Sequence, residues 1–229
     1  MPTAPTGVEL IGVFVIGYVI GSIPFAVLIA RRHGKNIFAE GSGNPGATNV
    51  KRVLGKKAGN VCFALDCLKG LAAAGWPMLP FLTMSDPRLL GIAGLLGAIL
   101  GHSASVFLKF RGGKGVATTI GGLAVLFPYV IAVGLAVWLT VYYASKVVSL
   151  ASLALALSLP LTGLVFVRDA DGSLFWWGWG FLLALCLLIF VRHHSNIRRL
   201  LKGQEGGFKK KNGRGGKNNG QSVIAKKKP

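Results

Sequence analysis

Charged side chains are scarce in this sequence. Only 14% of its 229 residues are Asp, Glu, Lys or Arg, whereas soluble domains carry about a quarter. Hydrophobic residues make up 52% of the chain. This composition leaves too little polar surface for a water-soluble globular domain, so it excludes that class and favours a protein embedded in a lipid bilayer.

Residues that hold metals or cofactors are also few. The seven acids are scattered, the four histidines form no HxxxH or HExxH pattern, and the three cysteines form no CxxC pair. No GxSxG sequence indicates an activated serine. We therefore expect no metal and no cofactor, and any catalysis should depend on electrostatic positioning.

Long uncharged runs, in contrast, are abundant. Four have the length of about 20 residues that a helix needs to cross the bilayer: Leu10–Ala30, Leu89–Leu108, Val147–Val167 and Gly172–Val191. A further helix is expected over Ala58–Leu82. Gly115–Ser145 is too long for one span, and Pro128 divides it into two helices of about 15 residues. The runs predict an all-α, polytopic membrane protein with about seven transmembrane helices.

The distribution of basic residues predicts the orientation. They cluster at Arg31–Lys57, Lys109–Lys114, Lys146 and from Arg192 onward, whereas acids mark the connections between these clusters. The positive-inside rule places the basic clusters in the cytoplasm, with the N-terminus outside and the C-terminus inside. The two helices of Gly115–Ser145 either cross the bilayer or form a re-entrant pair. Both arrangements keep the N-terminus outside and the C-terminus inside.

The net charge of +19 does not indicate nucleic-acid binding, because much of it lies in one segment. Residues 202–229 hold nine of the 26 basic residues among Gly and Asn, with no apolar periodicity. This composition is typical of a disordered tail, which either attracts anionic lipid or has no role. We therefore divide the chain into a membrane-embedded domain, 1–201, and a cytoplasmic tail, 202–229. We expect membrane lipids, and no nucleic acid, as partners.

Two opposite charges lie inside a predicted span. Asp66 and Lys69 are three residues apart and share one helical face. Charges within a membrane usually face a partner or a polar cavity. The two residues form either a structural ion pair or part of a polar site at the cytoplasmic end.

Three cytoplasmic segments favour phosphate binding. In Glu40–Arg52, the glycines spell GxGxxG, but the flanking membrane helices exclude a dinucleotide-binding fold. Such glycines still let backbone N–H groups approach an anion, with cationic and polar side chains nearby. The candidate residues here are Gly41, Ser42, Gly43, Asn44, Thr48 and Asn49, with Lys51 or Arg52 supplying the charge.

The second segment, Lys109–Thr119, opens a helix with a glycine loop that carries a lysine. It is not a Walker A sequence, because the spacing of its glycines differs. A helix start nevertheless attracts anions. The candidate residues are Gly112, Gly113, Lys114 and Thr118.

The third segment, Arg192–Leu201, follows the last span directly. His193 and Asn196 are three apart, so they can share a face that points toward a site. His102 lies near the cytoplasmic end of an earlier span, either as a phosphate ligand or as an interhelical hydrogen-bonding residue.

These segments resemble the PlsY-type bacterial glycerol-3-phosphate acyltransferases over nearly the whole chain, to about Glu205. The resemblance rests on several ordered motifs: GSIPF from Gly21, GSGNPGATNVKRVLG from Gly41, LDCLKG from Leu65, LGH from Leu100, GGKGVAT from Gly112, SLAS from Ser149 and the Arg192–Leu201 segment. One position departs, since the family often has Glu where this chain has Ser195. Ser195 is therefore not included in the site.

The resemblance implies an inner-membrane enzyme with its active site facing the cytoplasm. Its expected reaction transfers a fatty acyl group from acyl phosphate to sn-glycerol-3-phosphate, as the first step of phospholipid synthesis, giving 1-acylglycerol-3-phosphate and phosphate. It places five residues at functional positions: Ser42, Arg52, Lys114, His193 and Asn196. The general base stays open between His193, His102 and the phosphate of the acceptor.

A transporter for phosphate-containing anions is the main alternative. Transporters need a path across the bilayer and often contain internal repeats. The sequence shows no repeat, and its polar motifs lie on one predicted face. The acyltransferase is therefore the favoured interpretation.

Overall fold

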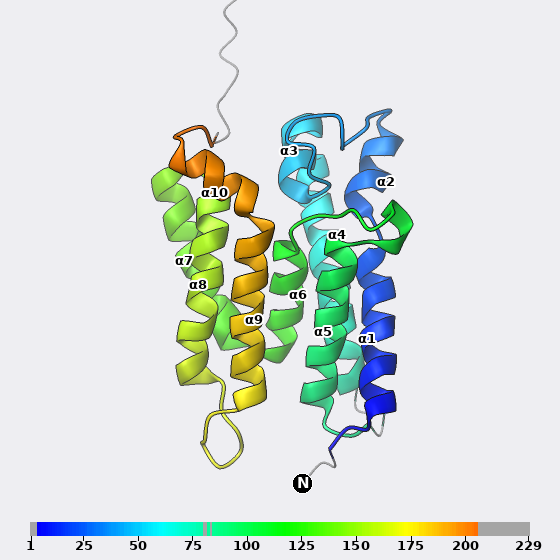
Figure 1. Ribbon diagram of the computed structural model, residues 1–229, viewed down its shortest axis with the longest axis vertical. Helices are drawn as coiled ribbons and strands as arrows, with labels where there is room; N and C mark the ends of the chain where they lie inside the picture. The colour runs from blue at the N-terminus through cyan, green and yellow to red at the C-terminus, as the bar shows by residue number, and fades with distance from the viewer. Residues whose placement is uncertain (1–3, 80–81, 83, 206–229) are drawn as a thin grey trace, which may run out of the picture.

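The computed structural model describes residues 4–79, 82 and 84–205, and this part of the chain is a bundle of α-helices (Figure 1). The long helices run roughly parallel, and short helices cover the end that carries α3 and α10. The helices and two 3₁₀ turns have these bounds: α1 Gly7–Ser22, α2 Phe25–Arg32, α3 Ala47–Leu54, α4 Lys56–Gly75, η1 Trp76–Met78, α5 Pro87–Ser103, η2 Val106–Leu108, α6 Val116–Leu126, α7 Pro128–Ser145, α8 Val148–Phe166, α9 Trp176–Arg192 and α10 His194–Leu201.

The bundle consists of two groups of helices. In one group, α1 packs on α5 and α4 packs on α6; in the other, α8 lies between α7 and α9. Contacts of α6 with α7 and of α5 with α9 join the groups. The main apolar core spans both groups, with Leu95 and Leu123 from one and Leu155 and Leu182 from the other fully buried.

Glycines let α1 and α5 approach closely. A Cβ atom on Gly17 would lie 2.1 Å from the carbonyl oxygen of Gly94, and one on Gly97 would lie 2.1 Å from that of Phe14. Helices in a bilayer associate through such close packing, because lipid tails remove the hydrophobic drive for association. The glycines of these two helices therefore bring the backbones of α1 and α5 into direct contact.

The composition of the helices agrees with a membrane protein. Among the described residues, four helical stretches are long and apolar enough to cross a bilayer: Gly7–Arg32, Lys56–Met78, Pro128–Ser145 and Val148–Phe166. The bent pair α9–α10 makes a fifth if it counts as one span, and α6 is apolar but short. The predicted all-α membrane fold is confirmed, whereas the number of seven spans and their orientation remain predictions.

Most predicted helices lie close to their observed positions, and three boundaries differ. The helix predicted to reach Leu82 ends at Gly75, where the 3₁₀ turn Trp76–Met78 follows. The first predicted span is broken at Ile23–Pro24, because proline disfavours the helical conformation of the preceding residue. The helix predicted to reach Leu108 ends at Ser103. There the chain turns back, because the Ser105 hydroxyl donates to the carbonyl of Ser22 (2.6 Å) and the Ser105 N–H donates to Arg111 (3.1 Å).

The break in the first span lies beside a buried charge cluster. The Lys69 ammonium is 2.9 Å from an Asp66 carboxylate oxygen and donates to the Ile23 carbonyl at 3.2 Å. His102 Nδ1 lies 3.6 Å from the same Asp66 oxygen. The side chains of Asp66 and Lys69 are each 3% exposed. Asp66 and Lys69 therefore form a buried ion pair, and both also line a small polar cavity at the end of the bundle that carries the glycine segments.

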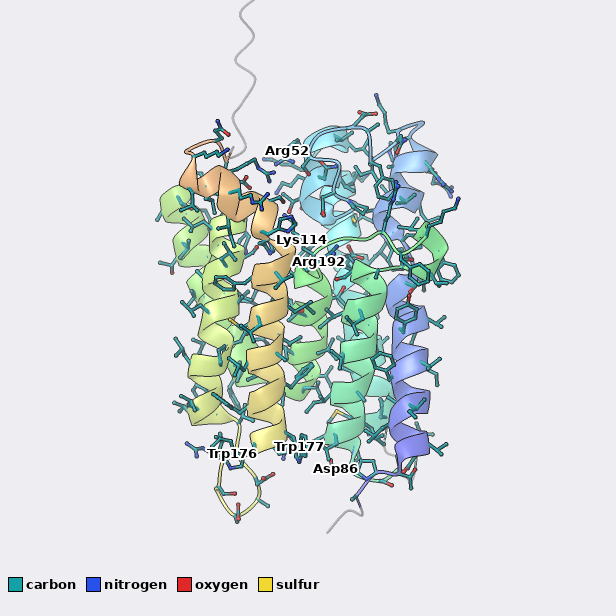
Figure 2. The ribbon with its side chains drawn as sticks, viewed as in Figure 1. Arg52, Asp86, Lys114, Trp176, Trp177 and Arg192 are labelled. Atoms are coloured by element: carbon teal, nitrogen blue, oxygen red, sulfur yellow. The ribbon has the colours of Figure 1, made fainter. Side chains whose placement is uncertain are left out.

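The two ends of the bundle differ in chemistry. Arg52, Lys114 and Arg192 lie toward the end that carries α3 and α10, whereas Trp176 and Trp177 lie at the opposite end with Asp86 (Figure 2). The two tryptophans are 68% and 74% exposed. Tryptophans gather at membrane–water interfaces, so this end has the character of a bilayer boundary.

The orientation can be tested by cysteine labelling in a variant in which Cys62, Cys67 and Cys186 are replaced by alanine. Lys35→Cys and Asp171→Cys then place single thiols on the two sides that the positive-inside rule predicts. We expect a membrane-impermeant maleimide to label Asp171→Cys on intact cells and Lys35→Cys only after permeabilisation. The reverse pattern would contradict the predicted orientation.

Candidate active site

Asn49 organises the first glycine segment. This buried side chain accepts a hydrogen bond from the Ser42 N–H (2.8 Å) and donates to the carbonyls of Ile37 (3.2 Å) and Glu40 (3.0 Å). Gly41 and Gly43 have φ angles of 63° and 68°, which glycine adopts readily. Gly41 and Asn49 thus shape the loop, whereas Ser42 lies exposed on it.

Arg52 follows on α3, one turn after Asn49. Its guanidinium donates to the Asn49 side-chain oxygen at 3.4 Å, and the residue is exposed. Asn44 and Thr48 are partly buried on either side of the start of α3 at Ala47. The helix start presents free backbone N–H groups beside these polar side chains, which suits an anion.

Arg192 holds the second glycine segment through hydrogen bonds to its backbone. One of its guanidinium nitrogens donates to three carbonyls, those of Ser103 (3.2 Å), Gly112 (3.2 Å) and Gly113 (2.8 Å). The Gly113 N–H donates to the His102 carbonyl at 3.0 Å. Arg192 is absent from the residues selected by sequence, although it begins the third segment. Nothing in the pattern indicated that it would hold the Lys114 loop.

The bend between α9 and α10 places the third segment against this loop. The two helices meet at 61°, and His193 and Asn196 are buried at the junction. The Lys114 ammonium donates to the Asn196 side-chain oxygen. The Nδ1 of His193 pairs with the Ile189 carbonyl at 2.8 Å, which leaves Nε2 as an acceptor when the ring is neutral. Burial, followed by the Lys114 charge, lowers the pKa of His193 to about 4, so the ring is neutral at pH 7.

His102 and Thr118 are buried among the helices next to the glycine segments. His102 contacts Asp66, and a Cβ atom on Gly113 would lie 2.3 Å from its Nε2. Thr118 is fully buried, and its backbone lies against Gly70 of α4. The structure therefore brings Lys114, His193 and Asn196 together at one place, but Thr118 lies within the helix packing and His102 within the buried charge cluster.

A small cavity connects the two glycine segments. Its volume is about 10 Å³, room for about one water molecule. Pro45 of the first segment lines it, together with Gly112 and Gly113 of the second and with the buried residues Asp66 and His102. Segments that are far apart in the sequence are thus neighbours at the same end of the bundle.

Cations dominate this end. Burial lowers the pKa of the Lys114 ammonium to about 8. The Glu205 carboxylate raises this pKa, whereas three nearby cations lower it: Arg199, Arg192 and Arg52. At neutral pH, Lys114 is therefore charged among further positive charges. A cluster of this kind suits a bound anion such as phosphate.

Glu205 is a second residue that the sequence did not single out. It lies at the end of the described chain, in the segment predicted as tail, and its carboxylate accepts from Ser149, Asn196 and Arg199. Lys202–Glu205 belong to the described residues, whereas 206–229 lie outside them, so the division at residue 201 stays a prediction.

The fold and the site define a class: an all-helical integral membrane protein whose glycine loops and cations lie together at one end of the bundle. Comparison with known proteins gives the family. The family model described as glycerol-3-phosphate acyltransferase matches residues 11–203. The chain belongs to this family of PlsY-type membrane acyltransferases, which act in phospholipid biosynthesis.

Relatives cover most of the chain. A glycerol-3-phosphate acyltransferase of Neisseria meningitidis is 41% identical over 83% of this chain and 93% of the relative. One of Wolbachia from Brugia malayi is 40% identical over 86% and 97%. The crystal structure of PlsY in its glycerol 3-phosphate form superposes with a TM-score of 0.77 at 36% identity and covers 87% of this chain and 96% of that one.

The close packing of Gly113 on His102 makes a sharp test of the loop. In Gly113→Ala the new methyl group would lie 2.3 Å from the imidazole, which Asp66 and its burial hold in place. The loop must then shift and carry Lys114 with it. We expect an activity loss of roughly 100-fold, the effect of a displacement of about 1 Å.

Gly12→Ala is the matched control, because nothing lies within 4 Å of its added Cβ. Both variants should elute from size-exclusion columns like the unchanged protein. Full activity of Gly113→Ala would show that the position of this loop does not matter for the reaction.

Proposed function

We propose that this protein transfers a fatty acyl group from acyl phosphate to sn-glycerol-3-phosphate and releases 1-acylglycerol-3-phosphate and inorganic phosphate. The proposal includes the location: a bacterial inner membrane, with the site facing the cytoplasm. The observation that carries it is the convergence of two glycine loops with Arg52 and Lys114. Both substrates carry phosphate, and two such loops suit two phosphates.

The neighbours support both the acceptor and the product. One PlsY crystal structure is the glycerol 3-phosphate form, and another, with a TM-score of 0.72 to this chain, is the lysophosphatidic acid form. A membrane-embedded bundle also suits a substrate with one water-soluble part and one acyl chain. The family assignment replaces the transporter considered from the sequence.

The proposed reaction is a direct transfer. The hydroxyl oxygen of the acceptor attacks the acyl carbonyl carbon, and the bond from that carbon to the phosphate oxygen breaks. The hydroxyl proton passes to a base, and phosphate leaves with the bonding electrons. Acyl phosphate is a mixed anhydride with a good leaving group, so positioned cations and hydrogen-bond donors suffice without an enzyme nucleophile.

The geometry favours His193 over His102 as the base. His193 is neutral at pH 7 and keeps an Nε2 lone pair beside Lys114. His102 faces the Asp66–Lys69 pair within the bundle. In this scheme Lys114 and Arg52 bind phosphate oxygens, and Ser42 donates a hydrogen bond from the first loop.

An assay with purified protein tests the donor. We expect 1-acylglycerol-3-phosphate from acyl phosphate and glycerol-3-phosphate, and no product when acyl-CoA or acylated acyl carrier protein replaces the donor. Lys114→Ala and Arg52→Ala should each lower kcat/KM roughly 10- to 150-fold, the effect of one lost charge-assisted hydrogen bond.

Lys57→Ala is the control for these two variants, since Lys57 is an exposed lysine at the start of α4. It should keep the activity of the unchanged protein. Acyl-CoA as the better donor would refute the proposed chemistry, and normal rates for both Lys114→Ala and Arg52→Ala at low substrate would remove these residues from the site.

Direct transfer also predicts that no acyl-enzyme forms on Ser42. A serine nucleophile needs an adjacent base, and among the described residues no hydrogen bond joins the Ser42 hydroxyl to a histidine or an acid. After incubation with labelled acyl phosphate alone, mass spectrometry should find the Ser42 peptide unmodified. Two-substrate kinetics should give intersecting lines.

A stoichiometric ester on Ser42 that added glycerol-3-phosphate discharges would overturn direct transfer. Ser42→Ala should be slow rather than inactive, and its residual rate measures how much the hydroxyl contributes to positioning.

A further inference from the structure

Glu205 links three elements around the candidate site. One carboxylate oxygen accepts from the Ser149 hydroxyl at 2.8 Å, at the start of α8, and from the Asn196 amide at 2.5 Å. The other oxygen accepts from the Arg199 guanidinium of α10 at 2.6 Å. The Glu205 side chain is only 11% exposed, so these contacts hold it in a largely buried position.

The bond to Asn196 determines what that amide offers to Lys114. A carboxylate only accepts hydrogen bonds, so the nitrogen of the Asn196 amide must face Glu205. The amide oxygen then faces the other way and accepts from the Lys114 ammonium. A continuous chain of hydrogen bonds therefore runs from Glu205 through Asn196 to Lys114.

Glu205 is also the negative charge among the groups that face Lys114. The other ionisable groups around Lys114 are basic and come from α3, from α9 and the junction after it, and from α10: Arg52, Arg192, His193 and Arg199. Without the carboxylate, these neighbours would favour loss of the Lys114 proton.

We propose that Glu205 is a positioning residue of the acyltransfer site, which orients the Asn196 amide and thereby keeps the Lys114 ammonium in place. Its negative charge also favours the protonated form of Lys114. This inference rests on the proposed role of Lys114 in binding phosphate. Glu205 acts through Asn196, because no hydrogen bond joins it to Lys114 or to Arg52 within the described part of the chain.

An internal anion that occupies the place of a substrate phosphate is the competing explanation. The contacts disfavour it, since Glu205 engages Ser149, Asn196 and Arg199 and leaves the hydrogen bonds of Lys114 and Arg52 to other partners. The two explanations predict opposite changes in KM for glycerol-3-phosphate when the charge of Glu205 is removed. KM should rise if Glu205 positions Lys114, and it should fall if Glu205 occupies the place of a substrate phosphate.

Glu205→Gln in the full-length chain is the test, because it keeps the shape of the side chain and removes its charge. We expect KM for glycerol-3-phosphate to rise roughly 2- to 12-fold, the range for a lost or weakened hydrogen bond. The unchanged enzyme should lose kcat/KM as the pH rises through about 8, where Lys114 deprotonates. In Glu205→Gln, this loss should begin at lower pH, because a stabilising negative charge is gone.

A chemical measurement gives the same information without catalysis. The rate at which acetic anhydride modifies Lys114, followed by mass spectrometry of its peptide, rises as the ammonium loses its proton. Its pH midpoint should move to lower pH in Glu205→Gln. If the protein shows no activity with acyl phosphate, the proposed function is contradicted. The pH midpoint of Lys114 modification would still test the inference.

Two controls separate charge from anchoring. Ser149→Ala removes one hydrogen bond to Glu205 and keeps the carboxylate, so the midpoint should stay in place. Asp169→Asn removes an exposed acid paired with Arg88 at 3.6 Å, and it should change neither KM nor the midpoint. A lower KM in Glu205→Gln would establish the internal anion instead. An unchanged KM and midpoint would overturn the inference.

Discussion

The buried pair of Asp66 and Lys69 is the contact on which the glycine loop around Lys114 depends. Charges within a bilayer need partners, and these two side chains neutralise each other at 2.9 Å. Lys69 also donates to the Ile23 carbonyl beside the break at Pro24, and Asp66 lies 3.6 Å from His102. His102 in turn packs under Gly113, so the position of the Lys114 loop depends on a pair buried within the bundle.

The site combines an excess of positive charge with few ways to neutralise it. Of the seven acids in the chain, Glu205 is the one that raises the pKa of Lys114, whereas the neighbouring guanidinium groups lower it. Such a cluster is electrostatically unfavourable when empty and favourable when phosphate is bound. In the proposed reaction, binding energy and catalysis therefore arise from the same charges, whose positions the helices fix before substrate arrives.

Much of the fold followed from hydrophobic length, and the errors have physical causes. Uncharged runs predicted the helices, and Pro128 correctly divided α6 from α7. Hydropathy did not show the break at Pro24 or the bend at His193, because both sides of each are compatible with a helix. The break has a local cause, the effect of Pro24 on Ile23, whereas the bend depends on contacts with neighbouring segments. The count of seven spans and the orientation rest on charge distribution and remain predictions.

The sequence alone determined the membrane class, the approximate helices and the three segments that we propose to bind phosphate, because length, charge and glycine spacing are local properties. The tertiary structure decided how these segments meet. It placed Asn196 on Lys114, put Arg192 beneath the glycine loop and brought Glu205 back to Ser149. These contacts join residues up to 82 positions apart, and such pairs depend on the packing of whole helices, which no local pattern records.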